Sequence, residues 1–292
     1  MIFNPVAKGD KARRFRDSLE SFAADCVLKK TNAAGDARRL ATEAIHEGFD
    51  LIIAAGGDGT LNEVLNGLGD APDGFTRACL GVLPLGTVNV FARELGIPLQ
   101  PEFAWKVIRQ GSPIRADLAR VEFTVHDRSE RRYFAQLAGA GLDARAIELV
   151  SWPLKKKIGP LAYLWAGLRA LTGKLPPVTA TASSQSLTGE LILVGNGRLY
   201  GGNYEVFPAA TLHDGRLDVC AFPRARWLTL ARCALPLLLR GRLPEAVVRR
   251  FQAESLTLTC ASAAALELDG ELVGHLPAQF SVVRGGLRVL AP

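Results

Sequence analysis

The first hundred residues alternate short apolar runs with segments in which apolar side chains recur every three or four positions. Residues 51–55 and 79–83 are continuous apolar runs that stop at turn-forming glycine or proline residues, a pattern typical of buried parallel strands. Shorter strands are predicted at residues 2–3 and 26–28, and helices over residues 11–24, 36–47 and 88–95 and from residue 61 onward. This order of strands and helices predicts a parallel sheet with helices on both faces.

From about residue 116 the pattern changes to strand-like runs separated by turns. The runs cover residues 120–125, 133–137, 191–194, 217–222, 256–260 and 280–283. In this half only residues 151–172 and 227–240 have helical periodicity. The sequence therefore predicts two domains, an α/β domain over residues 1–115 and a mainly antiparallel β domain over residues 116–292.

A content of 48% hydrophobic and 22% charged residues excludes an intrinsically disordered chain. The most apolar stretch, residues 227–240, contains Arg232 and Pro236 and falls short of the roughly 20 apolar residues that a membrane-spanning helix needs. The N-terminus lacks the basic and apolar regions of a signal peptide, and five scattered cysteines are typical of a reducing compartment. We therefore expect a cytoplasmic protein.

The chain is basic, with a net charge of +6 and an isoelectric point of about 9.2. Nucleic acid, an anionic membrane surface or a phosphorylated substrate would each attract such a protein. Nucleic acid is the least favoured partner, because the basic residues are not interleaved with aromatic ones and no nucleic-acid-binding motif is present. Charge alone does not separate the other two partners.

The sharpest motif is Gly56-Gly57-Asp58-Gly59-Thr60, which follows the apolar run at residues 51–55. Its glycines allow a tight turn and a close approach of the backbone to a ligand. We expect Thr60 and Glu63 to form a capping box, which leaves the other first-turn N–H groups to bind phosphate. Asp58 is a candidate ligand of Mg²⁺, directly or through water. A plain strand-to-helix turn is the alternative, above all for Glu63.

A second turn of this kind, Pro84-Leu85-Gly86-Thr87, follows the apolar run at residues 79–83. In a parallel sheet the two turns share the carboxyl edge, where ligands bind. The P-loop motif is absent from the sequence. Gly139-Ala140-Gly141 begins a match to the dinucleotide-binding pattern, but no strand ending in an acidic residue follows about 20 residues later, so this match is weak.

Taken together, these motifs resemble those of the diacylglycerol kinase catalytic family, which also includes sphingosine kinases and bacterial lipid kinases of the YegS type. The resemblance rests on Gly56-Gly57-Asp58-Gly59-Thr60 with LNEVLNGL after it, PLGTVNVFARELGIP, Asn4-Pro5, FAQLAGAGLDA, GNGRLYGGNYEVFPAATLHDGRLDV and Leu268-Asp269-Gly270-Glu271. These motifs occur in the family's order and cover nearly the whole chain. The first motif alone also occurs in NAD kinases and related phosphofructokinases, so the specificity lies in the ordered set.

The resemblance implies an N-terminal three-layer α/β domain like that of NAD kinases and phosphofructokinases, a C-terminal β-sandwich, and ATP bound in the cleft between them. It implies that the nucleotide is bound by Thr31, Gly57, Asp58, Gly59, Thr60, Leu61, Asn62, Glu63 and Thr87. It also implies a divalent cation, Mg²⁺ or Ca²⁺, held by the Asp214 side chain and the carbonyl oxygens of Thr211 and Arg216, with Asp218 close by. A simple hairpin turn at Asp214-Gly215 is the alternative.

By the same resemblance, Glu271 is the general base and acts in catalysis together with Asp58. A tight turn at Asp269-Gly270 would present Glu271 to the cleft, whereas an exposed turn carboxylate with no role is the alternative. One position departs from the family: Val90 stands where many bacterial relatives have an aspartate of the Mg²⁺–water network. Metal binding would therefore depend more on Asp58.

The function implied is transfer of the γ-phosphate of ATP to the hydroxyl of a diacylglycerol-like or sphingoid-like lipid, with peripheral contact to a membrane. Residues 151–172 combine tryptophans and leucines with Lys155, Lys156 and Lys157, which suits a membrane interface as well as it suits an amphipathic helix packed on the β domain. Two other functions stay open: a kinase of a soluble nucleotide such as NAD, and a non-catalytic nucleotide- or lipid-binding regulator. Val90 favours the regulator, and the presence of Asp58, Asp214 and Glu271 opposes it.

Overall fold

The computed structural model describes residues 1–5, 26–125, 128–149, 173 and 175–292. The helices predicted over residues 11–24 and 151–172, and the membrane-facing pattern in the second of them, lie outside these described residues. Within the described part of the chain, no helix combines the length and the apolar character needed to cross a bilayer.

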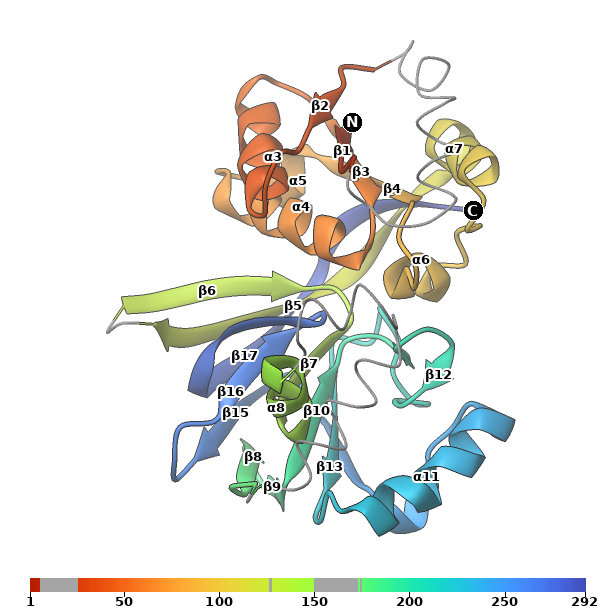
Figure 1. The fold of residues 1–292 in the computed structure, drawn as a ribbon. Coiled ribbons are helices and arrows are strands. Elements are labelled where there is room, and N and C mark those ends of the chain that lie inside the picture. The colour runs from red at the N-terminus through yellow and green to blue at the C-terminus, as the bar shows by residue number, and fades with distance from the viewer. Residues whose placement is uncertain (6–25, 126–127, 150–172, 174) are drawn as a thin grey trace.

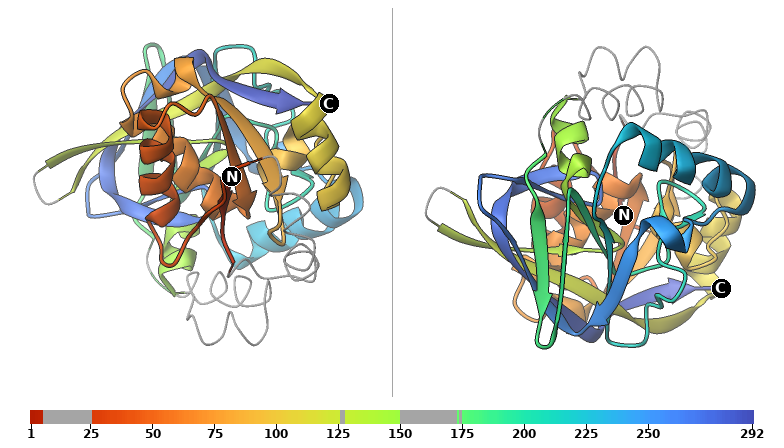
Figure 2. Two further views of the ribbon diagram at one scale, coloured as in Figure 1. Left: turned by 90° about the horizontal axis from the view of Figure 1, so that it is seen from above. Right: turned by 90° about the horizontal axis from the view of Figure 1, so that it is seen from below.

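The N-terminal half is an α/β unit (Figure 1). Its strands are β1 (Ile2–Phe3), β2 (Lys29–Lys30), β3 (Leu51–Gly56) and β4 (Cys79–Pro84). Its helices are α3 (Asp36–His46), α4 (Asp58–Asp70), α5 (Gly74–Arg77), α6 (Val90–Glu94) and α7 (Pro101–Gln110). The strands pair in parallel in the order β2-β1-β3-β4. Helices α3 and α4 lie on one side of these strands and α7 on the other, as Figures 1 and 2 both show, so the predicted three-layer arrangement is present.

One prediction in this half is wrong, and one helix was not predicted. The strand expected at residues 26–28 is displaced, because the N–H groups of Lys29 and Thr31 donate to the carbonyls of Met1 and Phe3 and so define β2. Two lysines fit there because β2 is the edge strand and their long side chains reach solvent. Helix α7 was not predicted; it begins with a proline and buries Ala104 and Ile108.

The C-terminal half is mainly β. Its strands are β5 (Ser112–Val125), β6 (Arg128–Phe134), β7 (Leu137–Gly141), β8 (Val178–Ala182), β9 (Gln185–Gly189), β10 (Leu191–Gly195), β11 (Leu199–Tyr200), β12 (Tyr204–Glu205), β13 (Leu217–Phe222), β14 (Arg249–Ala253), β15 (Ser255–Cys260), β16 (Ala265–Leu268) and β17 (Glu271–Ala291). Its helices are α8 (Leu142–Leu149), α11 (Trp227–Arg240) and the single turn η1 (Glu245–Val247). Strands β7, β10, β13 and β14 and the strands around β5, β15 and β17 are joined through β16 into one continuous sheet, and the two parts enclose an apolar core, as expected for a β-sandwich.

The strand predicted at residues 133–137 is in fact two strands, β6 and β7. The N–H groups of Ala135, Gln136 and Leu137 donate to the carboxylate of Asp269, so the chain leaves the ladder between β6 and β7. The helix predicted over residues 227–240 agrees with α11.

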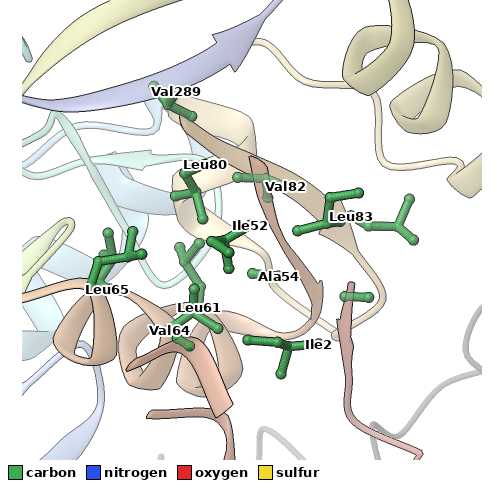
Figure 3. Packing of buried hydrophobic residues seen from close by; sticks show 14 of the residues in the cluster. Ile2, Ile52, Ala54, Leu61, Val64, Leu65, Leu80, Val82, Leu83 and Val289 are labelled. Atoms are coloured by element: carbon green, nitrogen blue, oxygen red, sulfur yellow. The ribbon is translucent and has the colours of Figure 1, made fainter. Parts of the chain in front are cut away.

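Strand β17 connects the two halves. It pairs with β16, β15 and β5 along its length, and at its far end Val289 lies opposite Leu80 of β4 in a parallel pair. Figure 3 shows Val289 beside Leu80 in the N-terminal core, which Ile52, Leu61 and Leu65 fill from β3 and α4. The first residue of β17 is Glu271, so one continuous strand runs from the predicted general base into the core of the other half. The boundary between residues 115 and 116 stays a prediction.

Candidate active site

The two glycine turns lie next to each other at the carboxyl ends of β3 and β4. The strands pair in parallel with Gly56 opposite Pro84, and the N–H of Leu85 donates to the carbonyl of Gly56 at 2.8 Å. A Cβ built on Gly86 would lie 2.5 Å from Cα of Gly57, so this contact requires glycine. The prediction that both turns share one sheet edge is confirmed.

The predicted capping box at Thr60 and Glu63 is wrong. Helix α4 begins at Asp58, with Gly57 as its N-cap and no side-chain cap, because the chain enters the helix before Thr60. The Glu63 carboxylate instead accepts the N–H groups of Gly35 and Ala37, each at 2.9 Å, at the start of α3. Since no side chain caps α4, its first-turn N–H groups point toward the space beyond the sheet edge and can bind an anion.

Asp58 joins the two turns. Its Oδ1 accepts the N–H of Val90 at 2.7 Å, at the first residue of α6. Burial raises the pKa of Asp58, and the nearby Asp269 adds to this rise, while the N–H groups of Val90, Asn89 and Phe91 oppose it. Val90 thus contributes a backbone N–H to Asp58, and a carboxylate keeps further lone pairs for a cation.

Glu271 lies directly over the start of α4. The turn before it contains Asp269 at φ 47° and Gly270 at φ 89°, both in the left-handed region. A Cβ built on Gly59 would lie 2.8 Å from Oε1 of Glu271. The predicted general base and the predicted phosphate-binding turn, more than 200 residues apart in sequence, are therefore in contact distance of each other.

The Asp269 carboxylate holds this turn in place. It accepts the N–H groups of Ala135 at 2.8 Å and of Gln136 and Leu137 at 3.0 Å each. It also accepts the side-chain amide of Asn62, from α4, at 2.9 Å. Burial raises the pKa of Asp269, and these four donors counteract the rise. Because the donors come from both halves of the molecule, the position of the turn depends on the packing of one half against the other.

Two further buried carboxyl groups, those of Glu267 and Asp143, lie next to the turn at Asp269 and Gly270. Glu267 Oε2 accepts the N–H of Gly270 at 2.8 Å, and Asp143 Oδ1 accepts the hydroxyl of Tyr200 at 2.9 Å. Their other oxygens, Glu267 Oε1 and Asp143 Oδ2, both face Gly139 and have no partner among the described residues apart from each other. Burial raises the pKa of both groups, most for Glu267. One proton held by Glu267 and donated to Asp143 satisfies both oxygens.

This arrangement explains the glycine at position 139. A Cβ there would lie 2.5 Å from Asp143 Oδ2 and 2.6 Å from Glu267 Oε1, so the residue leaves room for the carboxyl pair. Two buried carboxyls would repel a pyrophosphate, so the match to a dinucleotide-binding motif has a structural origin.

The other residues predicted to bind nucleotide lie in different environments. Thr31 is buried at the end of β2, and Thr87 is exposed in the turn after β4. The Leu61 side chain packs in the core, and the Asn62 side chain is hydrogen-bonded to Asp269, so either residue would contact a nucleotide through its backbone. Thr60 Oγ1 accepts the side-chain amide of Asn4 at 3.1 Å.

The predicted cation loop lies between β12 and β13. Asp214 Oδ1 accepts the N–H of Arg216 at 2.9 Å, and the buried Asp117 accepts the N–H of Gly215 at 2.6 Å. Burial raises the pKa of Asp218 to about 6, and Asp214 contributes to the rise. The described residues contain no group of three or more His, Cys, Asp or Glu side chains placed to hold a metal ion. The predicted ligands, one carboxylate with backbone carbonyls, are all hard oxygen atoms of the kind that Mg²⁺ and Ca²⁺ prefer.

A buried carboxylate also joins α6 to the C-terminal half. Glu94, with 4% of its side chain exposed, accepts the Nε of Arg198 and the N–H of Leu199, each at 3.0 Å, and the Nε2 of Gln136 at 3.2 Å. Next to it a hollow of about 400 Å³ reaches Thr211 and His213 of the cation loop. The helix after the second turn is thus fixed to the β half.

Sequence reasoning did not assign roles to Asp143, Glu267, Glu94 and Asp117. One signal was present: Glu267 alternates with Leu266 and Leu268 in an apolar strand, where an acidic residue must be buried or face a ligand. For the other three, the hydrogen-bond partners are 42 or more positions away, and nothing in their own surroundings in the sequence indicates burial.

The molecule combines an α/β half, whose two glycine turns are of the phosphate-binding kind, with a β-sandwich half. A carboxylate lies between the halves. This combination is typical of a two-domain phosphotransferase. The diacylglycerol kinase catalytic domain matches residues 1–121, and the YegS C-terminal NAD kinase β-sandwich-like domain matches residues 136–291. The chain belongs to this family of lipid kinases and is itself a lipid kinase.

Named relatives agree over the full length. The chain is 33% identical to the protein named "Probable lipid kinase YegS-like" of Stenotrophomonas maltophilia and 34% identical to a diacylglycerol kinase of Bacillus subtilis, in each case over 100% of this chain and 95% of the relative. The crystal structure of a diacylglycerol kinase from Bacillus anthracis superposes with a TM-score of 0.77 at 26% identity, covering 100% of this chain and 96% of that one. The predicted family and fold are confirmed.

Proposed function

We propose that this lipid kinase uses ATP and Mg²⁺ to phosphorylate the hydroxyl of a diacylglycerol-like lipid. The observation that carries the proposal is the position of Glu271 Oε1 over Gly59, at the uncapped start of α4. The choice of acceptor is supported by the names of relatives such as the diacylglycerol kinases of Bacillus subtilis and Staphylococcus aureus, which match the whole chain at 34% and 31% identity.

In the proposed reaction, the N–H groups at Asp58, Gly59 and Thr60 bind the phosphates. The Glu271 carboxylate orients the lipid hydroxyl and accepts its proton late, as the oxygen forms a bond to the γ-phosphorus and the bond from that phosphorus to the ADP oxygen breaks. The family's Mg²⁺ would neutralise charge on the phosphates, and Asp58 is the residue we propose to hold it. The backbone N–H of Val90 keeps Asp58 oriented toward the second turn.

A second cation is proposed at the loop of Thr211, Asp214 and Arg216. Its role is structural, because the loop is hydrogen-bonded through Gly215 to Asp117, which also accepts the N–H of Gly285 in β17 at 2.7 Å. A cation there would stabilise this loop, which is linked through Asp117 to Gly285 of β17. The proposal extends to a cytoplasmic location with peripheral contact to the membrane that supplies the lipid.

The test is transfer of labelled phosphate from γ-labelled ATP to a mixed-lipid extract with Mg²⁺, separated by chromatography, with Asp58→Asn and Glu271→Gln as controls. A labelled lipid that comigrates with phosphatidic acid and is lost in both controls supports the proposal. Label in a phosphorylated sphingoid base would correct the acceptor. A parallel reaction contains NAD in place of the lipid extract, and label in NAD would overturn the proposal in favour of a soluble acceptor. No turnover by a folded protein that binds ATP would overturn it in favour of a regulator.

A further inference from the structure

Helix α11 has two apolar faces. One face packs on the β half through Cys233, which is buried, and through Leu230. On the other face Trp227, Leu228, Leu235 and Leu239 are 64%, 55%, 63% and 74% exposed. Eight large hydrophobic side chains are exposed among the described residues, and four of them belong to this helix. Figure 1 shows α11 (light blue) at the edge of the β half, remote from α3 and α4.

The exposed leucines form one stripe. Because successive residues of an α-helix are rotated by about 100°, Leu228, Leu235 and Leu239 fall within about 40° of one another. Trp227 begins the helix about 100° around from Leu228, outside this stripe, whereas Arg232 lies about 40° from Leu228, on the flank of the stripe. An apolar stripe that faces solvent on a surface helix indicates a partner, because isolated exposed leucines would not align in this way.

The segment of the chain that contains α11 carries charge of one sign. Residues 223–244 contain five arginines and no aspartate or glutamate: Arg224, Arg226, Arg232, Arg240 and Arg242. Arg242 is paired with Glu205 at 2.5 Å, whereas Arg224, Arg226 and Arg232 are exposed. Arginines beside an apolar stripe match a surface that is anionic outside and apolar within, as a bilayer containing anionic lipid is.

Two other occupants match the charge less well. A second copy of the chain related by a twofold axis would place arginines against arginines. Residues 150–172 of the same chain contain Lys155, Lys156 and Lys157, which have the same sign of charge as the arginines of α11. Of the three candidates, only an anionic bilayer is attracted by both the stripe and the charge.

We propose that α11 is the surface through which the protein docks on an anionic bilayer, with Leu228, Leu235 and Leu239 at the boundary between headgroups and acyl chains and Arg224, Arg226 and Arg232 against lipid phosphates. The inference rests on the proposed function, because a long-chain lipid acceptor is reached at a membrane. It assigns to a described helix a membrane contact for which the sequence offered residues 151–172 as a candidate, beside the alternative of a helix packed on the β domain.

The test is cosedimentation of the full chain with vesicles of phosphatidylcholine alone and of phosphatidylcholine with phosphatidylglycerol. The double variant Leu235→Glu/Leu239→Glu removes the stripe, and Phe103→Glu is the matched control, because Phe103 is 53% exposed on α7 in the other half. We expect the wild type and the control to bind the anionic vesicles, and the double variant to bind at least about tenfold more weakly. Arg232→Gln should weaken binding to anionic vesicles about fivefold and leave binding to neutral vesicles unchanged. If Leu235→Glu/Leu239→Glu fails to fold by circular dichroism, Leu235→Ser/Leu239→Ser replaces it.

Docking and catalysis are separated by a short-chain, water-dispersed diacylglycerol. A double variant that phosphorylates this substrate at the wild-type rate, but loses activity on the same lipid in anionic vesicles, supports docking through α11. Unchanged vesicle binding by the double variant would overturn the docking proposal and leave the kinase intact. A wild-type dimer that the double variant converts to a monomer would also overturn it, in favour of a second copy as the occupant. Vesicle binding without phosphorylation of lipid in either form would refute the proposed acceptor and leave the docking surface standing.

Discussion

Oε1 of Glu271 occupies the space that a side chain at Gly59 would need, since a Cβ built on Gly59 would lie 2.8 Å from it. Gly59 belongs to the first turn of α4, where N–H groups are available to phosphate, and Glu271 begins β17 after a turn held by Asp269. The proposed proton acceptor and the helix end proposed to bind phosphate thus meet at one point. This meeting of an N-terminal glycine with a C-terminal carboxylate is the basis of the first three predictions below.

Glu271→Gln should lower kcat by about 10²–10⁴-fold, the usual contribution of a general base, because an amide cannot accept the proton of the lipid hydroxyl. Affinity for ATP, measured by calorimetry on the same protein, should stay unchanged. A variant that keeps wild-type turnover would remove Glu271 from the mechanism.

Gly59→Ala should separate activity from stability. Alanine favours a helix by up to about 1 kcal/mol over glycine. The atom that the new Cβ would meet is the end of the flexible Glu271 side chain, which can move away. The melting temperature should therefore stay the same or rise. We expect kcat to fall by about tenfold or more, because Glu271 must move. In the Glu271→Gln background, Gly59→Ala should lower kcat by a much smaller factor. If kcat falls by the same factor in both backgrounds, the two residues are not coupled.

Asp269→Asn should weaken both the fold and catalysis. The amide replaces one acceptor oxygen by an N–H₂ group that faces backbone donors, at a cost of about 1–3 kcal/mol for each donor left unpaired. Asn62→Ala removes one of the four donors to Asp269, together with the side-chain bonds of Asn62 to Tyr133 and Asn66, at a cost of about 1 kcal/mol for each bond, and leaves the three backbone donors to Asp269 paired. Denaturant unfolding and kcat should both rank wild type above Asn62→Ala and Asn62→Ala above Asp269→Asn; the reverse order would exclude Asp269 as the anchor of the turn.

Glu267→Gln should change how stability depends on pH. Burial raises the pKa of Glu267 in the folded protein, whereas in the unfolded chain this group ionises near its ordinary value of about 4.3. Above that pH the folded state holds a proton that the unfolded state has lost, so the free energy of unfolding of the wild type falls as pH rises toward the folded-state pKa. Glutamine can donate to Asp143 and accept from Gly270 without titrating.

The measurement is urea unfolding of both proteins at several values from about pH 5 to about pH 8, where the unfolded-state carboxyl is ionised. The slope of the free energy of unfolding against pH should be shallower for Glu267→Gln than for the wild type. Parallel curves would mean that Glu267 is ionised in the folded protein and that the proton is not shared with Asp143.

Asp214→Ala should abolish stabilisation by a divalent cation at the loop of Thr211, Asp214 and Arg216. Without ATP, Mg²⁺ or Ca²⁺ should raise the melting temperature of the wild type, because a ligand that binds only the folded state stabilises it. The control is Asp50→Ala, an exposed carboxylate before β3. A full cation-dependent shift in Asp214→Ala would place the ion elsewhere.

The sequence indicated much of the architecture because local physics fixes it. Continuous apolar runs before glycine turns predicted β3 and β4, and the shared sheet edge followed from parallel pairing. The ordered motifs predicted the family, which the matched domains confirm. The capping box failed because Thr60 and Glu63 satisfy a local pattern, whereas the structure uses Glu63 to hold the start of a different helix, α3.

What the sequence determined by itself is the buried strands β3 and β4, helix α3 and the two glycine turns, since each depends on side chains within a few positions of one another. That Glu271 is the base stays a prediction. Only the tertiary structure decided which distant groups meet: Glu271 with Gly59, Asp269 with Asn62, and Glu267 with Asp143. It also decided which face of α11 is exposed, because an amphipathic pattern with leucines on both sides does not state which side is covered. The physical reason is that burial and long-range hydrogen bonds depend on the packing of one half against the other, which no local spacing encodes.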